Sequence, residues 1–213
     1  MGAISCSKTD EPVAPAIEEI VPPKALAEMK PYITIYEGNT PPNIEGAYFL
    51  DPLETVFCQD YSEGHGFEPG KIVASQYIKF YNQNNATRTL EYMEKDRVDG
   101  AKNNAVGSGA FITGNNNNFT VYMNTEGTMK EIATKMAVVI SGTKTSSGIS
   151  NLQYAFVMVE KGDDPENELM KVGFFRVFKD KDGLASAVDW PTDSKSSGSL
   201  NKRDSMVDAV AQR

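Results

Sequence analysis

The sequence is poor in the side chains that most often carry chemistry. Among 213 residues it contains one histidine, His65, and two cysteines, Cys6 and Cys58. One imidazole cannot form a metal site or proton relay that needs two. Two cysteines allow at most one intramolecular disulfide, so the chain is not a disulfide scaffold. We therefore expect neither a metal nor a cofactor, and we expect Cys58 to be a buried strand thiol.

Long hydrophobic runs and positive charge are also scarce. No stretch approaches the roughly 18 apolar residues of a membrane-spanning helix. The 21 basic and 29 acidic residues give a net charge of −8. An acidic surface repels phosphate backbones, so no nucleic-acid partner is expected. What is present, 40% hydrophobic residues in a chain of single-domain length, suffices for a core.

Motifs for nucleophilic catalysis are missing as well. There is no Gly-x-Ser-x-Gly elbow, and His65 lies between Gly64 and Gly66, a pattern typical of a loop. A Ser-His-Asp triad is therefore not expected. The two carboxylates of a glycosidase leave no local signature, so an enzyme of that kind ranks last among the possible functions. We expect the protein not to be an enzyme.

Short β-type segments separated by turns dominate from residue 32 onward. The clearest alternation places Phe119, Val121 and Met123 opposite Thr120 and its polar neighbours, which predicts a half-buried strand. The segment 152–159 is apolar on both faces, so it is either central or covered by something apolar on each side. Strands are predicted at 32–36, 46–50, 71–81, 87–94, 107–113, 119–124, 133–141, 153–161 and 172–179.

The connections between these segments indicate an antiparallel sheet. The asparagine run within 114–118 predicts a hairpin tip, and the Asp-Gly pair at 182–183 predicts a turn. No segment between the strands is long enough for a helical crossover. The fold class is therefore all-β, an antiparallel up-and-down barrel of about eight strands, with a β-sandwich as the alternative.

Both ends of the chain differ in composition from the β-rich part. Residues 1–31 are rich in proline and acid, which predicts a flexible tether with one short helix over 24–29. Residues 191–213 are rich in serine and lysine and predict a mobile tail. The domain organisation is thus a tether (1–31), a β-barrel domain (32–190) and a C-terminal tail (191–213).

Cys6 is the candidate for a lipid anchor. Small or aliphatic residues precede it and a polar, acidic linker follows it, as at a lipoprotein processing site. A complete signal needs an apolar stretch of about 7–15 residues, and five residues precede Cys6, so the front of the signal would have to lie upstream. The alternative is an ordinary exposed cysteine.

Three segments together resemble a known group of proteins: SCSK (5–8), PPNIEGAY (41–48) and GFFRVFKDKDG (173–183). They are similar to lipocalin-like lipoproteins of Bacteroidetes-type Gram-negative bacteria. In a lipocalin opening strand a Gly-x-Trp places an indole across the barrel floor, and Tyr48 stands in that position here. The resemblance implies that Arg176 packs over this ring as a cation–π contact. It brings no catalytic residues.

The resemblance also implies a location and a function. Lys8 and the acids after it resemble tags that direct such lipoproteins to the outer face of the outer membrane. We expect an envelope-anchored lipoprotein that binds a small apolar or amphipathic ligand inside the barrel. The alternative is a surface interaction or glycan-binding module with a filled core. The candidate ligand-binding residues are Tyr48, Phe119, Val121, Met123, Tyr154, Phe156 and Arg176.

Overall fold

The structure, a computed structural model, describes residues 14–64, 66–73, 75–96, 104–129 and 132–191. Two short helices open this part of the chain, α1 (Ala14–Ile20) and α2 (Pro23–Met29). A single 3₁₀ turn, Tyr61–Glu63, is the other helical element. The strands are β1 (Asn39–Thr40), β2 (Gly46–Leu50), β3 (Leu53–Cys58), β4 (Gln76–Asn84), β5 (Thr89–Asp96), β6 (Asn104–Asn115), β7 (Asn118–Met129), β8 (Ile132–Lys144), β9 (Gly148–Lys161), β10 (Phe175–Asp180) and β11 (Leu184–Val188).

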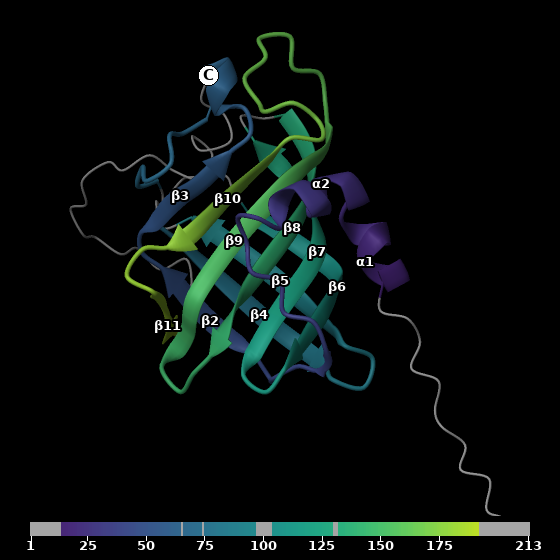
Figure 1. The fold of residues 1–213 in the computed structure, drawn as a ribbon, viewed down its shortest axis with the longest axis vertical. Coiled ribbons are helices and arrows are strands. Elements are labelled where there is room, and N and C mark those ends of the chain that lie inside the picture. The colour runs from purple at the N-terminus through teal and green to yellow at the C-terminus, as the bar shows by residue number, and fades with distance from the viewer. Residues whose placement is uncertain (1–13, 65, 74, 97–103, 130–131, 192–213) are drawn as a thin grey trace, which may run out of the picture.

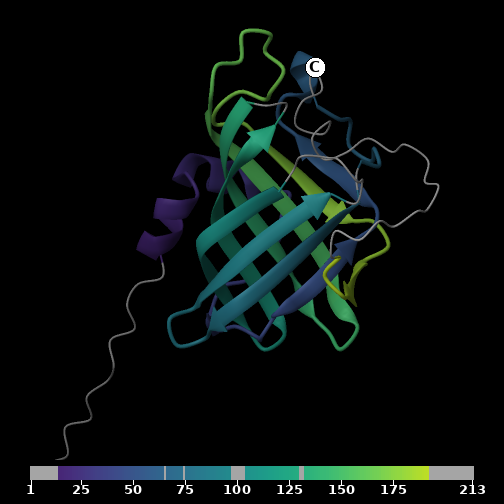
Figure 2. The same cartoon turned by 180° about the vertical axis from the view of Figure 1, so that it is seen from behind.

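The strands form one antiparallel sheet that closes into a barrel-like ring (Figures 1 and 2). Strands β2, β4 to β9 and β11 make up the ring, and β11 closes it by pairing with both β2 and β9. Strands β10 and β3 continue the sheet beyond β9, and the two-residue β1 adds a parallel pairing to β6. The all-β antiparallel prediction is confirmed. From β4 to β9, neighbours in the ring are also neighbours in the chain, as in an up-and-down arrangement.

Tight turns set the register of the ring. Asn115 pairs with Asn118, so the asparagine run forms the two-residue tip between β6 and β7, as predicted. Asn116 has φ of +56°, which asparagine tolerates better than most residues because its side chain can bond locally. This turn and the one between β8 and β9 lie at one end of the ring, called here the hairpin end. The segments 59–64, 66–73 and 162–174 lie at the other, called the loop end (Figure 1).

Residues 14–31 are not a free tether, in contrast to the sequence prediction. Val21 and Met29 are 0% exposed and belong to a second apolar cluster on the outside of the ring. Figure 1 shows α1 and α2 lying across this outer face. The predicted short helix exists, and α2 begins at Pro23, which suits a first turn because proline lacks only a donor that would be unpaired there. Residues 1–13 and 192–213 lie outside the described part.

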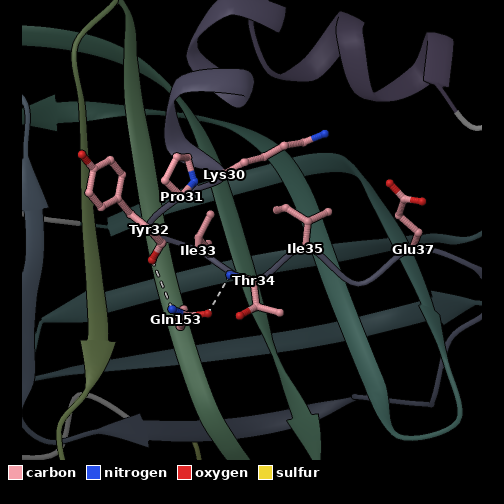
Figure 3. A pocket seen from close by; sticks show the side chains of 8 residues that line it. All are labelled: Lys30, Pro31, Tyr32, Ile33, Thr34, Ile35, Glu37 and Gln153. Atoms are coloured by element: carbon pink, nitrogen blue, oxygen red, sulfur yellow. Dashed lines mark hydrogen bonds between the residues drawn. The ribbon is translucent and has the colours of Figure 1, made fainter.

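After α2 the chain continues as an extended strap, residues 30–38, where a strand at 32–36 was expected. Side chains of the sheet hold the strap in place (Figure 3). The Thr34 N–H donates to Gln153 Oε1 at 2.8 Å, and Gln153 Nε2 donates to the Tyr32 carbonyl at 3.3 Å. Farther along, the Tyr36 N–H donates to Thr120 Oγ1 at 2.8 Å. Most of the strap therefore bonds to side chains of the sheet, and only at its end does the Gly38 carbonyl accept a backbone hydrogen bond from the Gly114 N–H of β6, at 3.2 Å.

The helices and strap explain why some strands are apolar on both faces. In β9, Tyr154 and Phe156 face the ring interior, while Ala155 and Val157 face the outer cluster. The expectation of apolar contacts on both sides of this strand is confirmed. Strand β7 differs from the half-buried strand predicted for it. Tyr122 on its outer face is only 1% exposed, because the N-terminal segment covers it.

Candidate functional site

The ring interior gathers the candidate ligand-binding residues. Six of them belong to one buried cluster and none of the six is more than 1% exposed: Tyr48, Phe119, Val121, Met123, Tyr154 and Phe156. Arg176 is also on the interior side, because its neighbours Phe175 and Val177 face the outer cluster. The alternation of the strands thus places all seven on one face.

Aromatic side chains pack the hairpin end of the interior. The Phe80 ring lies 6.3 Å from Tyr48, 5.5 Å from Tyr92 and 6.4 Å from Phe119, measured between centroids. The Tyr48 hydroxyl donates to the Ile44 carbonyl at 2.8 Å. Large rings in tilted and edge contacts leave each other little freedom. This end of the ring is a rigid core.

The contact expected between Arg176 and Tyr48 is absent. The cation above the Tyr48 ring is Lys144, whose Nζ lies 5.5 Å from the ring centroid. Arg176 instead bonds to Asp60, near the loop end. The difference follows from position in the fold, because Arg176 is the second residue of β10, directly after the long segment 162–174.

A carboxylate lies inside the ring between the two ends. Glu94 Oε2 accepts hydrogen bonds from the Tyr92 hydroxyl and, at 2.9 Å, from the Tyr154 hydroxyl. Burial raises the pKa of Glu94 above its usual 4.5, although both hydroxyl bonds act in the opposite direction. Glu94 nevertheless remains only half-buried, whereas both tyrosines are fully buried. An acidic group therefore lies on the interior face, beside two buried tyrosine hydroxyls.

Methionines replace the aromatic rings toward the loop end. Five of them belong to the interior cluster: Met123, Met129, Met136, Met158 and Met170. Met136 and Met158 are paired directly across β8 and β9. Methionine is unbranched and polarisable, so it adapts to irregular shapes. The loop end of the interior is thus lined by side chains that can rearrange.

A buried ion pair lies at the loop end. Arg176 Nε donates to Asp60 Oδ1 at 3.1 Å and Nη2 donates to Oδ2 at 2.5 Å, with both side chains no more than 2% exposed. Gly66, at φ of +74°, lies against the pair, and a Cβ there would be 2.9 Å from Asp60 Oδ1. Glycine is needed both for this backbone conformation and for this close approach. The segment after Asp60 therefore packs directly on the ion pair.

Cys58 lies beside this ion pair. Its thiol is free and buried, as predicted, and burial raises its pKa to about 11. A thiol with a raised pKa is mostly protonated and a poor nucleophile at neutral pH. The candidate anchor Cys6 and the lone His65 lie outside the described residues.

Sequence reasoning missed Glu94 and Asp60. Glu94 carried a usable signal, because Leu90, Tyr92 and Glu94 alternate on one face of β5. Asp60 carried none, since it lies in a loop and its partner is 116 residues away. In the described residues, histidine, cysteine and acidic side chains form no group of three or more that could hold a metal ion. Neither described helix has the length and apolarity to cross a bilayer.

A shallow depression of about 440 Å³ lies on the outside, beside the strap (Figure 3). Gln153 is the sheet residue in its lining, and this side chain already bonds to the strap. The other lining residues are Lys30, Pro31, Tyr32, Ile33, Thr34, Ile35 and Glu37. We therefore take the ring interior as the candidate site. Compared with protein-family models, curated proteins and solved structures, the chain matches none.

Proposed function

We propose that the ring binds a small amphipathic molecule in its interior, between Glu94 and the loop end. The observation that carries this proposal is the Glu94 carboxylate on the interior face, where two buried tyrosine hydroxyls donate to its Oε2. A carboxylate surrounded by an apolar core lowers the stability of the fold unless it is well paired. Its second oxygen, Oε1, suits a hydrogen-bond donor on a ligand, such as a hydroxyl or an amine.

The distribution of apolar side chains indicates where the rest of the ligand lies. The rings around Phe80 fill the hairpin end, so an apolar body fits better against the methionines. Methionine-rich linings accept ligands of different shapes. A pocket with a mostly apolar lining and a few polar groups is the usual form of a small-molecule site.

We further propose that the protein is an outer-membrane lipoprotein acylated at Cys6. The small and aliphatic residues before Cys6 and the acidic linker after it support this assignment. Seven residues, 7–13, separate Cys6 from α1, which begins at Ala14. At about 3.5 Å per residue the anchor would hold the fold within roughly 25 Å of the bilayer surface. Cells fed an alkyne-tagged fatty acid should label the wild type and leave Cys6→Ala unlabelled, whereas equal labelling would contradict the anchor.

Ligand binding is tested by titrating the full-length chain with the neutral fluorescent amine N-phenyl-1-naphthylamine. We expect saturable binding, weakened by more than about tenfold in Glu94→Gln, the loss of roughly one hydrogen bond to a charged group. Glu91→Gln is the matched control, because Glu91 lies on the outer face of the same strand and bonds to Asn82. No saturable binding by the wild type would overturn the proposal. It would favour the alternative of a surface interaction module with a filled core.

A further inference from the structure

The buried ion pair of Arg176 and Asp60 leaves part of the guanidinium unused. A guanidinium has five N–H groups, and Asp60 accepts from Nε and Nη2 only. Arg176 Nη1 is buried and has no hydrogen-bond partner among the described residues. Orphaned buried donors are rare in folded proteins because each has lost its bonds to water. A donor in this state would be satisfied by an acceptor that the described residues do not supply.

The surroundings make Arg176 a prepared site. Asp60 neutralises its charge, so the unliganded site does not bury a lone cation. Gly66 lies against the pair, and the next residue, Phe67, is buried. A guanidinium held on one edge presents its remaining N–H groups in a plane, which matches the two oxygens of a carboxylate.

We propose that Arg176 Nη1 is the docking point for the carboxylate head group of an amphipathic ligand. The inference rests on the proposed function and narrows the ligand to a class, the carboxylate-bearing amphiphiles. The head group would lie at the loop end, where β10 begins, and the apolar body would extend along the methionines. A hydroxyl farther along such a ligand could donate to Glu94.

The test compares dodecanoate with dodecan-1-ol, which share a chain and differ in the head group. Both are titrated into the full-length protein by displacement of N-phenyl-1-naphthylamine. We expect the wild type to prefer dodecanoate by about tenfold, the effect of one charge-assisted bond pair. The double variant Asp60→Leu/Arg176→Met replaces the pair without leaving a lone charge, and it should bind both compounds with the affinity of the alcohol.

The chain offers a matched control on β10 and on β3, the strand that leads to Asp60. Lys179 of β10 and Glu54 of β3 form an ion pair at 2.9 Å that is partly exposed, and Glu54→Leu/Lys179→Met removes it. This control should keep the preference for dodecanoate. If the wild type binds acid and alcohol with equal affinity, Arg176 Nη1 bonds only to water and the inference is overturned. The proposed function would still stand. If the wild type binds neither dodecanoate, dodecan-1-ol nor the dye, both the inference and the proposed function are overturned.

A second measurement uses the wild type alone, so it tests the inference even if the double variant does not fold. The carboxyl carbon of 1-¹³C-dodecanoate is titrated by NMR while bound to the wild type. A carboxylate docked on Arg176 should stay ionised to a lower pH than the free acid, because hydrogen bonds from the guanidinium favour the charged form more than the neighbouring Asp60 carboxylate opposes it. Titration at or above the value of the free acid would contradict the docking.

Discussion

The two ends of the ring interior are built from different side chains. At the hairpin end, Tyr48, Phe80 and Phe119 are fully buried and interlock as rings. Toward the loop end the interior carries methionines, a half-buried carboxylate and an ion pair with a spare donor. The same closed sheet therefore holds a rigid core at one end and an adaptable, partly polar region at the other.

This difference suggests that stability and ligand binding depend on different ends of the ring. Tight aromatic packing contributes most where every ring has several partners, and it needs no access to solvent. Polar groups inside a core lower stability, so a chain can tolerate them only if another region compensates. We infer that the hairpin end stabilises the ring and that the loop end uses part of this stability for recognition. Four predictions test the division.

The largest effect is expected at the hairpin end. Phe80→Ala removes a ring that contacts three other aromatic side chains, and it should lower the free energy of unfolding by about 4 kcal/mol. Urea denaturation followed by circular dichroism measures this loss. A loss below about 1 kcal/mol would mean that neighbouring side chains move to fill the space left by the Phe80 ring. The hairpin end would then not be rigid.

Breaking the ion pair should cost nearly as much. Arg176→Met alone leaves the Asp60 carboxylate buried without its partner and should lower the free energy of unfolding by about 3 kcal/mol. Adding Asp60→Leu should restore most of the loss. If the single and double variants are equally unstable in urea, the loss does not come from an unpaired Asp60 carboxylate. The contrast between an apolar hairpin end and a polar loop end would then not hold for this ion pair.

The Glu94 carboxyl should make stability depend on pH. Its folded-state pKa is raised by burial above the usual 4.5, so the folded chain holds more protons than the unfolded chain in the window above pH 4.5. The wild type should therefore lose stability as pH rises through this window, by about 1.4 kcal/mol for each unit by which the pKa is raised. Glu94→Gln should lack this loss, since an amide does not titrate.

Unfolding curves at pH 4 and pH 7 measure this difference. Glu91→Gln, on the outer face of the same strand, should follow the wild type. If Glu94→Gln shows the same change in the free energy of unfolding between pH 4 and pH 7 as the wild type, the Glu94 carboxyl is as solvated as a surface group. It would then not be part of a polar interior.

The smallest effect on stability is expected for the methionines. Met136→Leu and Met158→Leu keep volume and apolarity, so together they should change the free energy of unfolding by less than about 1.5 kcal/mol. Because leucine is stiffer, the double variant should bind a narrower set of chain lengths in the dye-displacement assay. An unchanged range of accepted chain lengths would show that the methionines act only as core.

Local pattern was enough to predict much of the sheet. The alternation of Phe119, Val121 and Met123 identified the interior face of β7, and strand β2 was predicted with its observed bounds. The asparagine tip and the proline at the start of α2 were also predictable. These features depend on neighbours within a few residues, so a single segment contains the information.

Three strands, β1, β3 and β11, and the role of the N-terminal segment were not predicted in this way. Strand β11 consists mainly of small residues and owes its existence to pairing with β2 and β9. Strand β3 pairs with β10, about 120 residues away in the chain. The proline-rich start reads as a tether, yet Val21 and Met29 cover an outer face whose apolarity was visible only in the distant strand β9.

By itself, the sequence determined the strand pattern, its antiparallel connections and which side chains face inward, because alternation and turn chemistry are local. Only the tertiary structure decided the ring closure, the helices that cover its outer face and the partners of Glu94 and Arg176. Those contacts join residues 60 to 116 positions apart, Tyr154 with Glu94 and Arg176 with Asp60. Such pairings depend on how the whole sheet curves, and no single segment specifies that curvature.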